Sequence, residues 1–336
     1  MKKKYKLKRN IKRNLIILFS VIVIGIVIYI GIQSLMSNRK QEKIEPLQPS
    51  TDTHKVENTD KNEEENENLQ VAVIGNSDAY SGWNPLQLWH EKGITSFVGA
   101  GAKQNTKLSY YILQEILSVS KPQILILEAN AFFDEREHLE PQGYEYTATK
   151  YCSKLFENTT KWNDIKDENY MNENFNKERM KLYGYYYNND MISYSGGYSY
   201  MKKTQEKESF SSFTKKYLPK IMNLCKENNI KVMLIAYPSA TSWTYKKYNA
   251  VNDYAQENDI PFIDFNIETN LTDFNWLTDS RDGGNHLNHS GATKMMSFFG
   301  DYLIEKYQIK NYKNNKNYQH WNEDYNEFIK KYVDKE

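Results

Sequence analysis

Short apolar runs alternate with longer amphipathic stretches over residues 69–307. Each run is apolar at nearly every position, which is typical of strands buried on both faces, and each is followed by a turn. The runs are LQVAVIGNS (69–77), ITSFVGA (94–100), QILILEAN (123–130), IKVMLIAYP (230–238) and PFIDF (261–265). This alternation predicts an α/β fold, namely a three-layer α/β/α sandwich around a mainly parallel five-stranded sheet.

The segments between the runs have apolar residues at helical spacing. Helices are expected at 106–118, 213–228, 245–258 and 291–307, and Asn84 with Pro85 is suited to open another as N-cap and first helical residue. In a parallel sheet of this kind, ligands bind at the carboxyl ends of the strands. The turns that follow the strands are therefore the places where functional side chains are expected.

Residues 134–209 interrupt the alternation and are dense in Tyr, Asn and Lys, with YGYYYNND and YSGGYSY as extremes. Two interpretations are open. The aromatic residues line a glycan groove or a partner surface, or the segment is a lid or loop region with the usual composition of this chain. The main domain is predicted to span residues 69–310 including this insertion, and residues 311–336 are predicted to form a polar, helical extension.

An uncharged stretch of 22 residues, 15–36, spans roughly 33 Å as a helix, enough to cross roughly 30 Å of hydrocarbon. Eight Lys or Arg precede it, which places the N-terminus in the cytoplasm by the positive-inside rule. We therefore expect a basic cytoplasmic head (1–14), a single-pass membrane helix (15–36) and a disordered tether (37–68), with the domain outside the cell membrane. A cleavable signal peptide is the alternative, but its apolar core is usually shorter.

Without the basic head, the chain has 36 basic and 43 acidic residues, a mildly acidic balance that argues against a nucleic-acid binder. Cys152 and Cys225 have no partners at ligand spacing, so they predict neither a zinc site nor a disulfide framework, and whether they pair with each other stays open. His289 follows His286 by three residues, but no set of carboxylates and imidazoles completes a metal site. No metal or other cofactor is expected.

A nucleophile and its base are predicted at the carboxyl edge of the sheet. Ser77 follows the first apolar run directly, in the turn GNSD (75–78). A serine hydroxyl is a weak nucleophile at neutral pH and needs an imidazole beside it, held in the right tautomer by a third group. The candidate imidazole is His286, which lies after the last strand and before the last helix, and either Asp282 or Asp279 is placed to orient it.

A tetrahedral intermediate also needs hydrogen-bond donors for its oxyanion. Ser77 can give its backbone N–H, and the glycine-rich loop after the second strand can give another, near Gly99 to Gly101. The third strand ends at Asn130, whose side-chain amide is expected at the same edge. Four loops would then converge on one point.

These blocks resemble the SGNH (GDSL-like) hydrolase superfamily in order and placement, over about residues 69–307. The resemblance implies the flavodoxin-like fold of that superfamily, with Ser77 as nucleophile, His286 as base and Asp282 as orienting acid. It also implies an oxyanion hole formed by Ser77, Gly99, Gly101 and Asn130.

Three departures from the superfamily pattern are visible. Asn76 stands where Asp is usual, and Glu128 stands where a Gly usually precedes the block of Asn130. The step from Asp282 to His286 is four residues where three is usual. The last departure leaves the choice between Asp282 and Asp279 open.

Within the superfamily, DGGNHLNHSGATK (282–294) and QILILEANAFF (123–133) look most like membrane-anchored members associated with membrane-bound O-acyltransferases, of the alginate O-acetylation or teichoic-acid D-alanylation type. The resemblance implies acyl transfer, with acetyl as the acyl group, to an envelope polysaccharide or teichoic-acid-like acceptor. A multi-span O-acyltransferase is the implied partner. The alternatives are an acyl esterase of the same fold and a non-catalytic adaptor that binds the acyltransferase through the Tyr-rich insertion.

Overall fold

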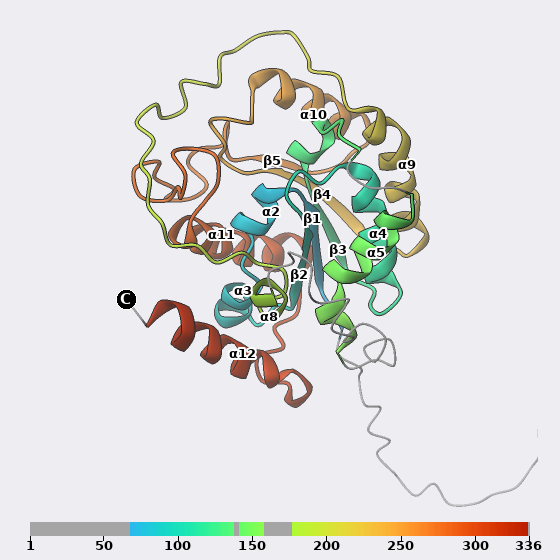
Figure 1. Ribbon diagram of the computed structural model, residues 1–336, viewed down its shortest axis with the longest axis vertical. Helices are drawn as coiled ribbons and strands as arrows, with labels where there is room; N and C mark the ends of the chain where they lie inside the picture. The colour runs from blue at the N-terminus through green and yellow to red at the C-terminus, as the bar shows by residue number, and fades with distance from the viewer. Residues whose placement is uncertain (1–67, 138–140, 158–176, 335–336) are drawn as a thin grey trace, which may run out of the picture. The chain divides into compact units, whose positions relative to one another are not determined.

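A five-stranded parallel sheet forms the centre of the domain in a computed structural model, which describes residues 68–137, 141–157 and 177–334 (Figure 1). The strand order is β2-β1-β3-β4-β5, and every neighbouring pair is parallel. The strands are β1 (Val71–Gly75), β2 (Ser96–Ala100), β3 (Ile124–Glu128), β4 (Lys231–Ala236) and β5 (Phe262–Asp264). The predicted α/β class and all five strands are confirmed, and the order is that of the flavodoxin-like folds.

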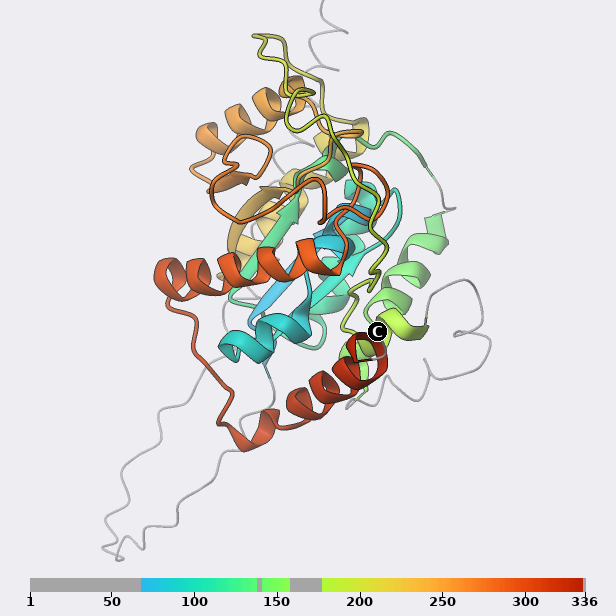
Figure 2. The ribbon, with the colours of Figure 1, turned by 90° about the vertical axis from the view of Figure 1, so that its left-hand side faces the viewer.

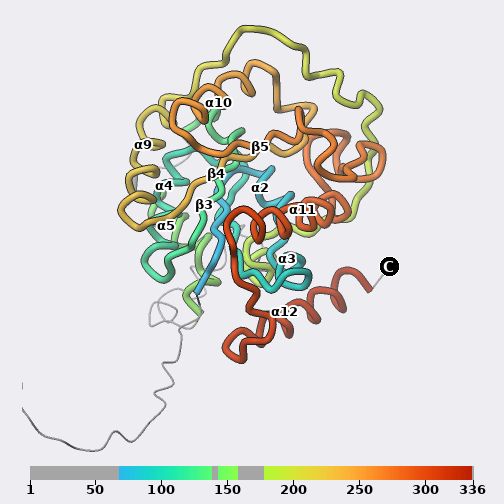
Figure 3. The backbone as a smooth tube through the Cα atoms, turned by 180° about the vertical axis from the view of Figure 1, so that it is seen from behind, coloured from blue at the N-terminus to red at the C-terminus, as the bar shows by residue number. Residues whose placement is uncertain are grey.

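Helices cover both faces of the sheet, since successive strand residues point to opposite sides. Ala72 and Ile74 of β1 face one core, and Val71 and Val73 face the other. One face is covered by α4 (Thr106–Leu117), α5 (Pro141–Tyr151), α9 (Ser212–Glu227) and α10 (Tyr245–Glu257). The other is covered by α2 (Ser77–Gly82), α3 (Pro85–Lys92) and α11 (His289–Tyr307). The view from behind separates the two layers (Figure 3).

The helices begin where the sequence offers side-chain caps. Asn84 accepts a hydrogen bond from the Gln87 backbone N–H with Pro85 as the first residue of α3, as predicted. Asn288 caps α11 in the same way, so that helix starts at His289, two residues before the predicted start. The Asn288 cap ends the loop that carries His286.

The described part of the Tyr-rich insertion is mostly irregular. It contains α5, the 3-10 turn η2 (Ser153–Phe156) and α8 (Lys177–Lys181), and the 3-10 turn η1 (Ala129–Phe133) lies directly before it. The yellow-green segment from α8 to α9 then runs around the periphery of the domain (Figure 1). Several of its tyrosines pack rather than line a groove: the rings of Tyr194, Tyr198 and Tyr200 all lie within 6 Å of the buried Trp276 ring.

The C-terminal extension is helical and packs on the domain through α12 (His320–Phe328), flanked by η3 (Lys316–Tyr318) and η4 (Ile329–Val333). Trp321 of α12 is 1% exposed, stacks on Tyr183 at 3.9 Å and lies 5.6 Å from the Trp89 ring of α3. Figure 2 views the molecule from the side of α11 and shows α12, in red, below α3. The extension therefore belongs to the packed domain.

The predicted cytoplasmic head, membrane helix and all but the last residue of the predicted tether lie outside the described residues. No helix within 68–137, 141–157 and 177–334 combines the length and apolar character needed to cross a membrane. Both cysteines lie within these ranges. Cys152 and Cys225 are buried and form no disulfide with each other.

Candidate active site

The turn between β1 and α2 presents Ser77 at the carboxyl edge of the sheet. β1 ends at Gly75, and the side chain of Asn76 accepts the Asp78 backbone N–H at 2.8 Å, which starts α2 at Ser77. Gly75 is required by close approach, because a Cβ there would lie 2.4 Å from the Cβ of Glu128 in β3. The chain can therefore turn sharply against β3 and expose the serine.

Ser77, His286 and Asp282 form a connected chain of side chains. The Nε2 atom of His286 lies 2.8 Å from the Ser77 Oγ, and its Nδ1 lies 2.5 Å from Asp282 Oδ2. The second oxygen of Asp282 accepts the backbone N–H of His286 at 2.8 Å. The structure thus brings together three residues that the sequence singled out, two of them 209 positions apart.

Asp279 does not contact the imidazole. Its side chain is fully buried and accepts hydrogen bonds from Lys294 Nζ at 2.8 Å and from the Asn275 backbone N–H at 2.7 Å. It therefore anchors α11 to the preceding loop, and Asp282 is the carboxylate beside His286. Burial acts to raise the pKa of Asp282, but the hydrogen bonds and charge of His286 outweigh it and hold that pKa below its usual range.

Asn130 follows β3 in η1 and faces the same cavity as Ser77. Its Nδ2 donates to Asp78 Oδ2 at 2.9 Å and to Ser242 Oγ at 2.8 Å. Its Oδ1 accepts a hydrogen bond from Lys247 Nζ at 2.9 Å. The amide is thus held on both ends with its N–H groups on the side of Asp78 and Ser242.

The two glycines of the predicted glycine loop serve close packing, and neither of them lines the cavity at Ser77. Gly99 lies within β2 with the Ile112 side chain against its Cα, and Gly101 packs against the Tyr151 ring. Both glycines permit close packing, and the cavity is lined instead by the next two residues of the loop, Ala102 and Lys103. An oxyanion role for Gly99 and Gly101 stays a prediction.

Two buried carboxyl groups beneath the nucleophile were not predicted. Asp78 has Oδ1 3.8 Å from His286 Nε2, and burial raises its pKa. Glu128 is 1% exposed, and burial, aided by the neighbouring Asp78, raises its pKa to about 8 despite hydrogen bonds from backbone N–H groups. The departure of Glu128 from the superfamily pattern was the only sequence signal for this pair, and nothing in the sequence pointed to Lys247 or Ser242.

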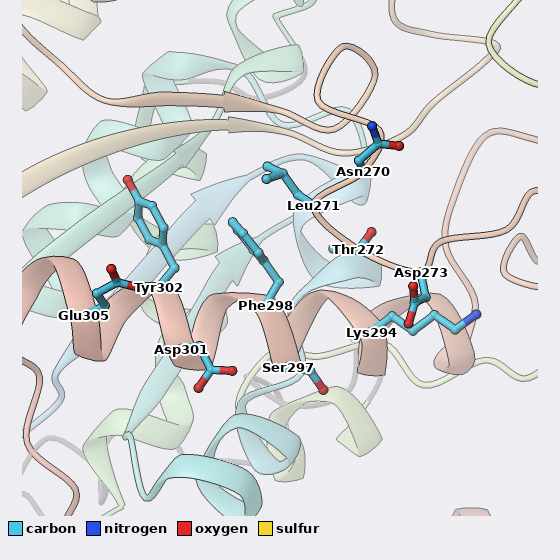
Figure 4. A pocket seen from close by; sticks show the side chains of 10 residues that line it. All are labelled: Asn270, Leu271, Thr272, Asp273, Lys294, Ser297, Phe298, Asp301, Tyr302 and Glu305. Carbon is cyan, nitrogen blue, oxygen red and sulfur yellow. The ribbon is translucent and has the colours of Figure 1, made fainter.

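The cavity at Ser77 has a volume of about 640 Å³ and is lined mainly by polar side chains. A second pocket of about 460 Å³ lies between α11 and residues 270–273 (Figure 4). Its lining includes Phe298, Tyr302 and Glu305 but no residue of the Ser77 cluster. Among the residues that the structure describes, no group of three or more His, Cys, Asp or Glu side chains is arranged to hold a metal ion.

The geometry at Ser77 is suited to nucleophilic catalysis. A neutral imidazole hydrogen-bonded to the serine can accept its proton during attack on a carbonyl carbon, and a carboxylate on the other nitrogen fixes the tautomer and stabilises the imidazolium that forms. The Asn130 amide lines the same cavity, and its role as a donor for developing negative charge stays a prediction. Serine, base and donor come from the ends of separate elements.

No protein-family model and no curated protein matches the sequence. Among solved structures, the chain is similar to a proposed lipolytic protein of the G-D-S-L family from Desulfitobacterium hafniense. The two share 13% identity with a TM-score of 0.39, and the match covers 70% of this chain and 100% of that one. It is also similar to a proposed acylhydrolase from Bacteroides fragilis (14% identity, TM-score 0.34, coverage 73% and 89%). A GDSL-like lipase from Bacteroides thetaiotaomicron matches at 12% identity, TM-score 0.32 and coverage of 70% and 88%. Likeness at this level says nothing about the reaction of this chain, which has to be inferred from the site.

Proposed function

We propose that this protein is a serine-dependent O-acyltransferase. The observation that carries the proposal is the connected chain from Ser77 Oγ through His286 to Asp282, with separations of 2.8 and 2.5 Å. Ser77 Oγ attacks the acyl carbonyl carbon while its proton passes to His286 Nε2. The imidazolium returns that proton to the leaving alkoxide, and an acyl-serine remains.

The second half-reaction decides what the enzyme makes. A hydroxyl of an acceptor gives its proton to His286 and attacks the carbonyl carbon of the acyl-serine. The bond from that carbon to Ser77 Oγ breaks, and His286 passes the proton to Ser77 Oγ, which restores the serine and completes the transfer. The same residues would use water if no acceptor were bound, and the product would then be a free acid, as in an esterase. Acceptor binding and exclusion of water separate the two reactions.

The proposed setting is the outer face of a cell membrane. The apolar stretch 15–36 supports an anchor with the N-terminus in the cytoplasm, and the resemblance supports acetyl as the acyl group. An envelope polysaccharide or a teichoic-acid-like polymer is the proposed acceptor, and a multi-span O-acyltransferase is the proposed partner that supplies the acyl unit. The polar lining of the cavity at Ser77 suits a carbohydrate acceptor.

The first experiment asks whether Ser77 is a nucleophile. Full-length protein purified in detergent is treated with a fluorophosphonate probe, from which an activated serine displaces fluoride. We expect labelling of the wild type and of Ser118→Ala, a control outside the site, and none of Ser77→Ala. Absence of labelling in wild-type protein with a cooperative thermal transition would overturn the proposal in favour of a non-catalytic adaptor.

The second experiment asks where the acyl group goes. The same protein is incubated with p-nitrophenyl acetate and chitopentaose, and the oligosaccharide is analysed by mass spectrometry. A Ser77-dependent mass gain of one acetyl group supports transfer. Acetate release without acetylated product, with this acceptor and with a teichoic-acid fragment, would make the protein an esterase.

A further inference from the structure

Lys247 lies behind Asn130 in the wall of the cavity. It is the third residue of α10, and its Nζ donates to Asn130 Oδ1 at 2.9 Å and to the Ser242 carbonyl at 2.7 Å. The same ammonium group lies 5.0 Å from the centre of the Phe133 ring. Lys247 thus contacts three residues that line the cavity beside Ser77.

Two physical effects oppose a positive charge at this position. The first turn of a helix carries the positive end of the helix dipole, which disfavours a cation there. Burial lowers the pKa of Lys247, and nearby carboxylates, Glu208 foremost, offset this only in part. Both effects make a positive charge unfavourable at this position of α10. A role in the cavity therefore explains Lys247 better than a role in stabilising the helix.

The contact with Lys247 fixes which way the Asn130 amide points. An ammonium group has only donors, so the atom of Asn130 that faces it must be the carbonyl oxygen. The Nδ2 atom is then turned toward Asp78 Oδ2 and Ser242 Oγ. The amide has two N–H donors and both are engaged, so a substrate oxygen could accept from Nδ2 only by displacing one of these acceptors.

We propose that Lys247 is a positioning residue for acyl transfer, which locks the Asn130 amide with its N–H groups on the side of Asp78 and Ser242, two residues that line the cavity beside Ser77. This inference rests on the proposed function of Ser77. The positive charge on the carbonyl side of the amide also polarises it and strengthens its N–H groups as donors. Lys247 therefore acts through Asn130 and acts most strongly when the oxyanion forms.

The test compares Lys247→Met with Lys246→Met in the full-length protein. Methionine keeps the apolar stem of Lys247 without the charge, and Lys246 is the exposed neighbour that pairs with Glu206. With p-nitrophenyl acetate, we expect kcat of Lys247→Met to fall about 10- to 100-fold, since a charged hydrogen bond is lost. We expect KM within about threefold of wild type, because the interaction matters in the transition state. Lys246→Met should match wild type in both.

A double-mutant cycle shows whether Lys247 acts through Asn130. Asn130→Ala should lose about 100-fold in kcat, and the double variant Asn130→Ala/Lys247→Met should lose no more than Asn130→Ala alone. Losses that multiply, or a Lys247→Met variant with wild-type kcat, would overturn the role of Lys247. Fluorophosphonate labelling of the wild type keeps the two proposals apart, since it tests Ser77 without reference to Lys247.

Discussion

Asp282 holds His286 with both of its carboxylate oxygens. Oδ2 lies 2.5 Å from the imidazole Nδ1, and Oδ1 accepts the backbone N–H of the same histidine at 2.8 Å. The first contact selects the tautomer in which Nε2 faces Ser77 Oγ without a proton, and the second fixes the backbone from which the ring extends. A single side chain thus sets both the tautomer and the position of the imidazole.

Asp282→Asn should therefore abolish most activity without unfolding the protein. The amide of an asparagine can donate its N–H to Nδ1, which leaves the imidazole proton on Nε2. An imidazole in this tautomer cannot accept the proton of Ser77. We expect kcat with p-nitrophenyl acetate to fall about 10²- to 10⁴-fold. Asp301→Asn is the control, since the Asp301 side chain is 74% exposed on α11 and should be neutral. An Asp282→Asn enzyme with wild-type kcat would remove Asp282 from the mechanism.

Substitution of Asp279 should lower the stability of the protein and leave its activity nearly unchanged. Its buried carboxylate pairs with Lys294, so Asp279→Asn leaves that ammonium without its counter-charge and weakens the contact between α11 and the preceding loop. We expect a loss of about 1–3 kcal/mol in the free energy of unfolding, measured in urea, because Lys294 keeps some access to solvent. kcat per folded molecule should stay within about threefold of wild type. A large fall in kcat with unchanged stability would assign the orienting role to Asp279 instead.

The C-terminal helix α12 should contribute to the stability of the domain. Trp321 is 1% exposed and stacks on Tyr183 at 3.9 Å, so Trp321→Ala would leave a cavity between α12 and α3. We expect a loss of about 3–5 kcal/mol in the free energy of unfolding, measured by urea denaturation of the full chain. Glu327→Ala, at an exposed position of the same helix, should change it by less than about 0.5 kcal/mol. Equal stability of the two variants would mean that α12 packs only weakly.

The strands and the meeting of Ser77 with His286 could be predicted because both depend on local patterns. Apolar runs mark the buried strands, and residues that follow parallel strands share one edge of the sheet. The choice between Asp279 and Asp282 could not be predicted, since both precede His286 in an irregular loop where spacing does not fix direction. That choice depends on Lys294 in α11, which holds Asp279 in the core.

The sequence also could not predict which strands would lie side by side or which distant helix would reach the site. Glu128 meets the Ser77 turn because β3 lies beside β1, an order that the runs alone do not determine. Lys247 reaches Asn130 from α10, 117 positions along the chain. Gly99 and Gly101 match a glycine block, but the packing of Ile112 and Tyr151 decides where their backbone lies.

Glu128 gives the domain a pH-dependent contribution to stability. Its carboxyl group accepts backbone N–H groups of Asn130 at 2.6 Å and of Asn76 at 3.4 Å, so it joins the turn of the nucleophile to the turn of the proposed oxyanion donor. Burial raises its pKa from 4.5 to about 8. Between these values the folded chain binds more protons than the unfolded chain, because the folded carboxyl group stays protonated.

The stabilisation of the folded state that comes from the raised pKa of Glu128 is therefore complete below about pH 4.5 and is lost as the pH rises through about 8. Glu128→Gln removes the titrating group and keeps an acceptor for the Asn130 N–H. With urea unfolding at intervals from pH 5 to pH 8, we expect wild-type stability to fall relative to that of Glu128→Gln, by up to about 1.4 kcal/mol per pH unit. Two stability curves that run parallel over this range would show that Glu128 is ionised in the folded protein and that its pKa is not raised.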